Sequence, residues 1–361
     1  MGKLLLKLLV VLAWIIGLAW MQRQSLPPYW GNEDFTHKYE YFREHATEHT
    51  MLFVGSSVIY RHLVPTIFNN NAPASLPTNA FNLGVSAASP PEQYYLLDVI
   101  LNDPELDLSN IKVIIVDLEE TTLVRGQNAS TSRVKYFMNP NMLQRTLALL
   151  PERADQDAGP EEEWSYIKAT AGWALNLGMT EDMLAYKAAQ ALPDSLKEYP
   201  ELGNKLDGFR PLDRDFRFRT RSEEFHGSDV EEYHRRIANA TTRYLDQWEK
   251  APDEEAMALK AQHTAEALYY IEAFKARGIH LIWLVPPRYP LPKIYPLAYS
   301  LPREHWLAVV DPREHEKLFD SAFAFDRGHY NLKGAQWYSR QVVKELKPLL
   351  DSLGQEATLG E

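Results

Sequence analysis

The chain of 361 residues contains no cysteine. It therefore offers no thiol nucleophile, no cysteine-ligated zinc, no disulfide and no attachment site for the lipid of a lipoprotein. An excess of positive charge is also missing, since 38 Lys and Arg against 49 Asp and Glu give a formal net charge of −11. A nucleic-acid-binding protein needs a basic face that displaces counterions from phosphates, so we expect no nucleic-acid partner.

The N-terminus carries a long apolar segment. Lys3 and Lys7 precede an uncharged run over residues 8–21, which is the layout of a signal sequence or a signal anchor. We predict a retained anchor over residues 1–23 that crosses the inner (cytoplasmic) membrane once and leaves the rest of the chain on the periplasmic side. Cleavage after Ala19, at a weak small-x-small site, is the alternative.

Composition and punctuation divide the remainder of the chain. Residues 24–49 are expected to form a juxtamembrane linker and a polar helix. Residues 50–352 are long and apolar enough for one large domain with a sizeable core. The pattern within it breaks at about 124–250 into acidic, Pro-punctuated and aromatic segments, which predict a mainly helical insertion. Residues 353–361 are expected to be a frayed tail.

Buried strands alternate with helices in the predicted domain. The helical stretch at residues 90–102 is one of those that follow a strand. This alternation favours an α/β fold with a parallel sheet and helices on both faces. The strands are expected in four apolar runs: MLFVG (51–55), AFNLGV (80–85), IKVIIVDL (111–118) and IHLIWLVPP (279–287).

Two hypotheses stay open for the insertion, namely a lid or substrate platform and a solvated elaboration of the surface. Its aromatic side chains are candidates either for sugar platforms or for a core. These are Trp164, Trp173, Tyr199, Phe209, Phe216 and Phe218.

Polar residues with catalytic chemistry follow the predicted strands. Ser57 follows the first strand in the turn Gly55-Ser56-Ser57, and Asp326 and His329 lie three residues apart before the last helix. Residues after parallel strands meet at one edge of the sheet. A carboxylate at that spacing can hold the tautomer of the imidazole while its other nitrogen faces a hydroxyl.

This arrangement resembles the SGNH (GDSL-type) hydrolase superfamily. Gly55-Ser56-Ser57 is similar to its first block, Gly84 to the glycine of its second block, and Asp326 with His329 to its last block. The resemblance implies a flavodoxin-like three-layer fold with Ser57 as nucleophile, His329 as general base and Asp326 as its partner. The backbone N–H groups of Ser57 and Gly84 are then expected to form the oxyanion hole.

The third block departs from the family pattern. Glu119 stands near the position where an oxyanion-stabilising Asn is expected, and an ionised carboxylate cannot donate a hydrogen bond. Arg61, one helical turn beyond Ser57, is a candidate for binding an anionic substrate, and we count Glu119 among the residues of the same pocket.

The GSSVIYR stretch and the anchor look most like the exported branch that works beside membrane-bound O-acyltransferases, as in alginate O-acetylation or lipoteichoic-acid D-alanylation. The expected function is that of a serine acyl esterase or O-acyltransferase acting on a cell-envelope polysaccharide or polymer, with a membrane-bound O-acyltransferase as partner and neither cofactor nor metal. The alternative is a catalytically weak or inactive glycan-binding or scaffolding partner of such a transferase.

Two other motifs compete with this site. Ser86 lies in Gly-Val-Ser-Ala-Ala, which is similar to the nucleophile turn of α/β-hydrolases. His45 and His49 match an inverted zinc-protease pattern and would share a face of one helix. We favour a solvated polar helix for the histidine motif, because no recognisable motif supplies a third ligand.

Overall fold

The computed structural model describes residues 2–73, 76, 78–119, 131–152, 160–193, 199–248, 257–258, 260–290 and 296–359. These residues fall into two compact units. The helical unit comprises residues within 2–36, 89–99 and 121–198, and the α/β unit comprises residues within 37–88, 100–120 and 199–361.

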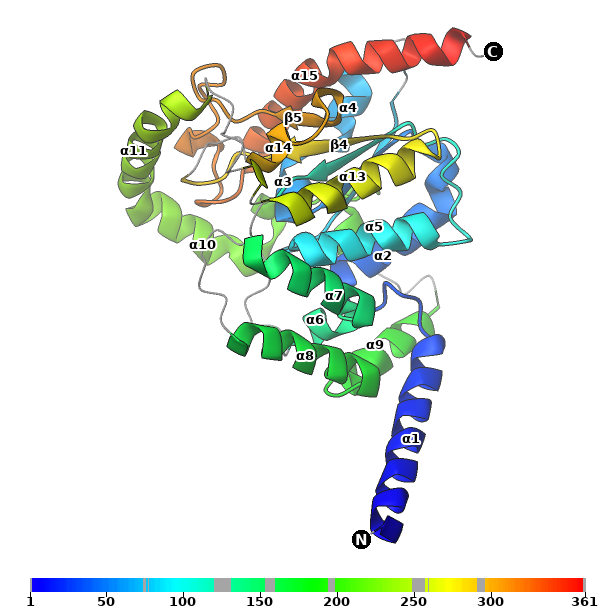
Figure 1. The fold of residues 1–361 in the computed structure, drawn as a ribbon. Coiled ribbons are helices and arrows are strands. Elements are labelled where there is room, and N and C mark those ends of the chain that lie inside the picture. The colour runs from blue at the N-terminus through cyan, green and yellow to red at the C-terminus, as the bar shows by residue number, and fades with distance from the viewer. Residues whose placement is uncertain are drawn as a thin grey trace. The chain divides into compact units, whose positions relative to one another are not determined.

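A five-stranded parallel sheet forms the centre of the α/β unit (Figure 1). The strand order β2-β1-β3-β4-β5 places β1 between β2 and β3, with Met51 opposite both Ala80 and Val113. The strands are β1 (Met51–Gly55), β2 (Ala80–Gly84), β3 (Val113–Asp117), β4 (His280–Val285) and β5 (Trp306–Ala308).

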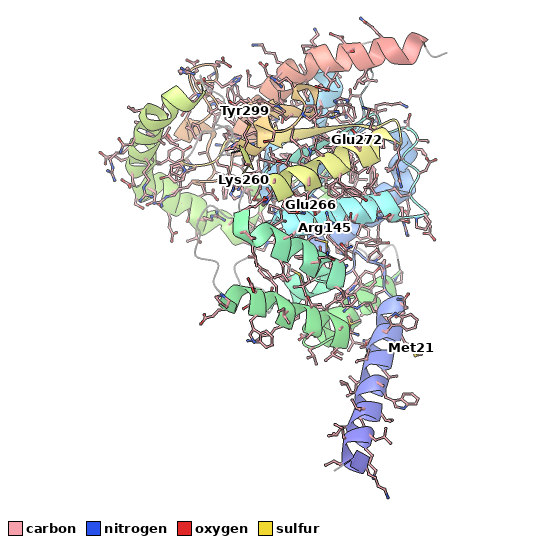
Figure 2. All side chains as sticks on the ribbon, in the orientation of Figure 1. Met21, Arg145, Lys260, Glu266, Glu272 and Tyr299 are labelled. Carbon is pink, nitrogen blue, oxygen red and sulfur yellow. The ribbon has the colours of Figure 1, made fainter. Side chains whose placement is uncertain are left out.

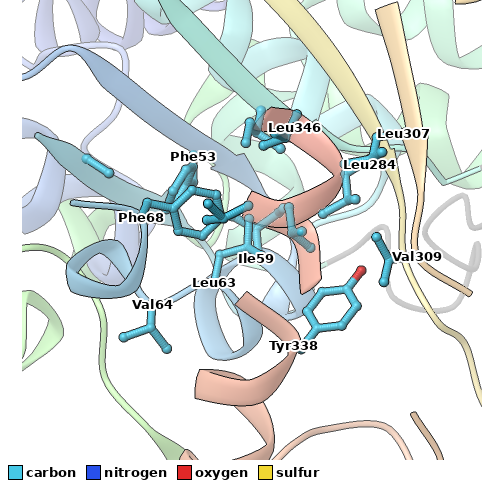
Figure 3. Packing of buried hydrophobic residues seen from close by; sticks show 14 of the residues in the cluster. Phe53, Ile59, Leu63, Val64, Phe68, Leu284, Leu307, Val309, Tyr338 and Leu346 are labelled. Atoms are coloured by element: carbon cyan, nitrogen blue, oxygen red, sulfur yellow. The ribbon is translucent and has the colours of Figure 1, made fainter. Parts of the chain in front are cut away.

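Helices cover one face of this sheet through a continuous apolar cluster. The cluster joins α3 (Ser57–His62), α4 (Pro65–Asn71) and α15 (Leu332–Leu359) to alternate strand residues such as Phe53 and Leu284. Figure 3 shows Ile59, Leu63 and Tyr338 within the cluster. Alternate residues of a strand point to opposite faces, so the remaining strand residues need a second cover.

The second face is covered by α13 (Ala261–Lys275), which packs beside β4, and by the C-terminal half of α2 (Glu33–His45). In the latter, the Phe42 ring lies 5.4 Å from that of Phe81 on β2. The described chain is therefore an α/β protein in which both sheet faces are buried, and this explains why its strands are almost wholly apolar.

The remaining elements have these bounds. The α/β unit also contains α10 (Arg219–Glu224), the π-helical turn η8 (Phe225–Asp229), α11 (Val230–Trp248), α14 (Pro296–Tyr299) and short 3-10 turns, which are η1 (Ala46–Glu48), η5 (Pro200–Leu202), η6 (Leu212–Arg214), η7 (Phe216–Phe218), η9 (Arg303–His305) and η10 (Ser321–Phe323). The helical unit contains α1 (Gly2–Gln24), α6 (Ser132–Phe137), α7 (Pro140–Leu149), η3 (Leu150–Glu152), α8 (Pro160–Leu175) and α9 (Thr180–Gln190). Helix α5 (Pro90–Asn102) contributes to both units.

Helix α1 is long and apolar enough to cross a membrane, and only 6% of its most apolar window is buried. Figure 2 shows its side chains, with Met21 labelled, projecting from the helix. The structure thus agrees with an N-terminal apolar helix at the predicted residues 1–23, of which residues 2–23 are described.

The structure differs from the predicted organisation of the chain in three places. The described part of the insertion at 124–250 is divided, because residues up to 193 lie in the helical unit and residues from 199 in the α/β unit. The tail at 353–361 continues helix α15 as far as Leu359, since GQEATL is rich in helix-forming residues. Strand β5 was missed because it is only three residues long.

The predicted polar helix at 33–49 also differs from the structure. Helix α2 ends at His45, and its Phe35, Tyr39 and Phe42 are fully buried. These three residues recur at helical spacing and form an apolar stripe among charged neighbours. The helix is therefore part of a core and is not solvated on all sides.

Gly84 offers a test of how closely α3 approaches β2. A Cβ at this position would lie 2.4 Å from the Tyr60 backbone nitrogen, and backbone cannot move aside as a flexible side chain can. We predict that Gly84→Ala costs about 1–3 kcal/mol, measured as the free energy of unfolding in urea. Gly227→Ala is the control, because a Cβ there meets nothing within 4 Å. Equal unfolding midpoints for the two variants would contradict the prediction.

Candidate active site

The turn between β1 and α3 is held by a buried carboxylate, Asp117, at the end of β3. Ser56 donates to this carboxylate twice, from Oγ to Oδ2 at 2.5 Å and from its backbone N–H to Oδ1 at 2.9 Å. Gly55 has a φ of 147°, and a Cβ on it would lie 1.8 Å from Asp117 Oδ1, so only glycine fits. The first hydroxyl of the Gly-Ser-Ser turn is therefore structural.

Ser56 also begins the helix that carries Ser57. Its Oγ accepts a hydrogen bond from the Val58 N–H at 3.2 Å, as an N-cap residue does. Ser57 follows as the first residue of α3 and is the one residue between Met51 and Pro65 that is not buried. The second hydroxyl of the turn is thus presented to solvent by a segment that is otherwise packed.

Ser57, His329 and Asp326 lie in one chain of hydrogen bonds. His329 Nε2 is 2.9 Å from Ser57 Oγ, and His329 Nδ1 is 3.0 Å from Asp326 Oδ1. With Nδ1 protonated and donating to the carboxylate, Nε2 accepts the Ser57 hydroxyl. The structure brings together the three residues that the sequence proposed as nucleophile, base and acid partner, although they come from segments about 270 residues apart.

The Asp326 carboxylate is bound from several directions. It accepts the backbone N–H groups of Gly328 at 2.7 Å and His329 at 2.9 Å, and Arg221 Nε lies 2.9 Å from its Oδ2. Burial raises the pKa of Asp326, but the hydrogen bonds of His329 and Gly328 and the charge of Arg221 outweigh it, so the pKa lies below its usual value. The carboxylate is ionised at neutral pH and can stabilise an imidazolium.

A second histidine, His62, lies behind the site. Its Nε2 accepts the backbone N–H of Tyr330 at 3.2 Å, and its ring centroid is 6.0 Å from that of His329. Burial, followed by the charges of His329 and Arg288, holds the pKa of His62 well below its usual value. The neutral ring thereby fixes the backbone next to the proposed base.

The strand order explains why these residues meet. Ser57 follows β1 and Asp117 ends β3, and these two strands are neighbours at the position where the order of the sheet reverses. In open α/β sheets the crevice at such a point lies beyond the carboxyl ends of the strands and is the usual ligand site.

The structure contradicts the predicted role of Gly84 as an oxyanion donor. Its N–H donates to Asn82 Oδ1 at 2.8 Å, and its carbonyl accepts from Lys38 Nζ at 2.7 Å. Gly84 is required instead because α3 passes so close to it. Ser57 keeps the predicted donor position, because the N–H of a first helical residue has no acceptor within its own helix.

Arg61 is not a substrate-binding residue. Its side chain is 2% exposed, its Nη1 donates to the Arg210 carbonyl at 2.6 Å, and its guanidinium lies 3.8 Å from the centroid of the Tyr60 ring. Its position one helical turn beyond Ser57 suggested that it faces the pocket, whereas a loop distant in sequence covers it.

Glu119 is buried and forms an ion pair with Arg288, a residue that the sequence analysis missed. Arg288 follows β4, and its Nη2 is also 3.8 Å from Asp117 Oδ2. Burial raises the pKa of Asp117, and the Arg288 charge and the Ser56 hydrogen bonds oppose that rise. Glu119 therefore does not face the pocket as a bare carboxylate, and a cation lies at the same strand ends.

Arg221 was also missed, as it lies in α10 within the supposed insertion. Arg288 could have been identified from the sequence, because it directly follows a predicted strand in VPPR. No signal in the sequence links Arg221 to Asp326.

A cavity adjoins the His329–Asp326 pair, and its walls include His62, Tyr233, Tyr289, Leu318 and Phe319.

The competing motifs do not form sites of their own. Ser86 lies in a turn, and helix α5 begins only at Pro90, so the strand-nucleophile-helix junction of an α/β-hydrolase is not formed. His45 ends α2, and His49 lies beyond η1, so the two histidines do not share one helical face. Over the described ranges, no group of three or more His, Asp or Glu is placed to hold a metal ion.

Searches of family models, curated proteins and solved structures found no match to the chain. The interpretation of the site consequently depends on its geometry.

The buried neutral His62 makes stability depend on pH. The unfolded histidine takes up a proton below about pH 6.5 whereas the folded one does not, so the wild type loses up to about 1.4 kcal/mol of stability per pH unit as the pH falls. We predict that His62→Gln, which keeps an acceptor for Tyr330, removes this contribution and flattens the profile. Urea unfolding at several pH values measures it, and parallel profiles for the two proteins would contradict it.

The Arg288–Glu119 pair allows a second test. Arg288→Met takes the cation away from two buried carboxylates, Glu119 and Asp117, and we expect a loss of about 1–3 kcal/mol in unfolding free energy. Glu119→Gln in the same chain removes one of these charges, so the double variant should be more stable than the Arg288→Met single variant. Simple additivity of the two single effects would show that the ion pair is energetically unimportant.

Proposed function

We propose that the protein is a serine acyl esterase or O-acyltransferase. The observation that carries the proposal is the 2.9 Å contact between Ser57 Oγ and His329 Nε2, with Nδ1 of the same imidazole on the Asp326 carboxylate. His329 is 16% exposed and Asp326 only 4%, so the imidazole edge reaches solvent while its carboxylate partner stays buried. This is the arrangement that activates a hydroxyl nucleophile.

The reaction proceeds in two steps. Ser57 Oγ attacks an acyl carbonyl carbon while His329 Nε2 takes its proton, and collapse of the tetrahedral intermediate expels an alcohol that receives this proton. The acyl group is then an ester on Ser57. Water or a sugar hydroxyl attacks it with His329 again as base, which releases an acid or transfers the acyl group.

Stabilisation of the oxyanion is the weak point of the site. The Ser57 N–H is one donor, the Gly84 N–H is engaged by Asn82, and Glu119 stands in place of an Asn. Loss of one hydrogen-bond donor to the oxyanion typically lowers the rate by ~10²–10³-fold. We therefore expect either slow turnover or a substrate whose acyl group is already activated.

The proposed substrate is a cell-envelope polysaccharide or polymer, and the proposed partner is a membrane-bound O-acyltransferase. Both follow from the resemblance of GSSVIYR and the anchor to the exported SGNH branch. Helix α1 would hold the protein in the inner membrane with the α/β unit on the periplasmic side.

The second candidate is a glycan-binding or scaffolding partner without turnover. The engaged Gly84 N–H favours it, and so does Phe216, which is 88% exposed in the α/β unit and offers a ring on which a sugar could stack. Trp164, at 56% exposed, also presents its ring to solvent, whereas Phe209 is buried.

An acyl-adduct experiment separates the two candidates. The full-length protein in detergent is incubated with an activated acetyl ester, release is followed, and the adduct is located by mass spectrometry. We predict an acetyl group on Ser57 and a loss of at least about 10³-fold in rate for Ser57→Ala and for His329→Ala.

Ser86→Ala is the matched control, since it removes a hydroxyl from the competing motif and should leave the rate unchanged. Equal inertness of wild type and variants, together with binding of a cell-envelope glycan, would favour the scaffold. An adduct on Ser86 would overturn the proposed nucleophile.

A further inference from the structure

The C-terminal end of α1 is built into the helical unit. Arg23 Nη2 donates to the Trp173 carbonyl at 2.5 Å and to Asn176 Oδ1 at 2.7 Å, and Asn176 Nδ2 donates to the Ala19 carbonyl at 3.0 Å. Lys187 Nζ reaches Ser25 Oγ at 2.9 Å. The α8–α9 hairpin, residues 160–192, therefore lies at the level where the apolar run of α1 ends.

Helix α8 exposes large apolar side chains beside charged ones. Tyr166 and Ala169 are fully buried, whereas Trp164 is 56% and Ile167 38% exposed. Pro160 and Ala171 are also exposed on the same side as Trp164, by helical spacing. The charged residues Glu161, Glu163 and Lys168 are exposed on α8 too. Exposed Trp and Ile side by side with charged residues are typical of a helix that lies at a membrane interface.

The turn and α9 continue this exposed apolar surface. Leu177 in the turn is 55% exposed, Leu184 on α9 is 59% exposed, and Leu192 just beyond α9 is 46% exposed. Outside α1, the described large apolar side chains that are exposed number eight, and five of them belong to this hairpin. Such concentration in one segment marks an interaction surface.

Continuity with α1 identifies the occupant. The hairpin is hydrogen-bonded to α1 at Ala19 and Arg23, next to the exposed Trp20 and Met21 of the same helix. If α1 spans a bilayer, its last apolar turn is at the boundary with the headgroups. Lys168 Nζ lies 5.9 Å from the centroid of the Trp164 ring, and Trp with Lys is the pair enriched at this depth.

We propose that the α8–α9 hairpin lies in the interfacial layer of the bilayer that α1 spans, with Trp164, Leu177 and Leu184 inserted among the headgroups. The inference rests on the membrane anchor proposed above and is independent of the acyl chemistry. The hairpin would then fix the depth and the tilt of α1 in the bilayer, because the hydrogen bonds of Arg23 and Asn176 hold the end of this helix.

The absence of cysteine makes the test direct, because one introduced cysteine carries one label. Leu184→Cys and Trp164→Cys are made in the full-length protein, labelled with a nitroxide and reconstituted into nanodiscs of phosphatidylcholine and phosphatidylglycerol. Electron paramagnetic resonance compares collisions with oxygen, which concentrates in lipid, and with a nickel chelate, which stays in water. Tyr269→Cys on α13 is the matched control, being 55% exposed in the α/β unit, and Leu12→Cys reports on α1.

We expect the ratio of oxygen to nickel collisions to be severalfold higher at 164 and 184 than at 269, and highest at 12. A water-like ratio at 164 and 184 with a lipid-like ratio at 12 would overturn the proposal and leave the anchor intact. A water-like ratio at 12 would overturn both the membrane anchor and the interfacial position of the hairpin. Few collisions with either reagent at 184 would show a protein cover, and so a second copy of the chain in place of lipid.

Discussion

The buried carboxylate of Asp117 is the constraint on which the candidate site depends. An ionisable group without exposure must be satisfied by donors, and Ser56 supplies two of them while Arg288 supplies positive charge. The same contacts require glycine at position 55 and cap helix α3. Ser57 is therefore presented by a turn that cannot rearrange without leaving a buried carboxyl group unsatisfied.

The loop that carries the other two residues of the site is also held by several contacts. The loop that carries Asp326 and His329 is bound through its own backbone N–H groups, through His62 at Tyr330, and through Arg221 from α10. The partners come from different elements, so the imidazole is oriented by packing at long range. Preorganisation of this kind is what a nucleophile and its base need, because a shift of about 1 Å can cost ~10²-fold in rate.

The N-terminal apolar helix and the candidate active site lie in different units. Each residue of the Ser57–His329–Asp326 chain lies in the α/β unit, whereas α1 and its hydrogen-bonded hairpin belong to the helical unit. The predicted insertion is thus divided: its first part packs on α1, and in its second part Arg221 pairs with Asp326 of the candidate site. The contacts of Arg23 and Asn176 also give α1 a structural role, which favours a retained helix over a cleaved signal.

Local pattern was sufficient for the four longer strands, because a strand buried on both faces must be a short apolar run. It also placed Ser57 at the edge of the sheet, because this residue follows β1. Asp326 and His329 follow no strand directly and were selected by their three-residue spacing before the last helix. The local sequence pattern could not predict the hydrogen-bond and ion-pair partners of the polar side chains. Arg61 was expected to bind an anionic substrate and instead donates to the Arg210 carbonyl. The Gly84 N–H was expected to face an oxyanion and donates to Asn82. Glu119 was expected as a bare carboxylate and is paired with Arg288. The physical reason is that burial and hydrogen-bond partners are set by segments that lie far away in the chain, and those segments meet only when the tertiary structure packs.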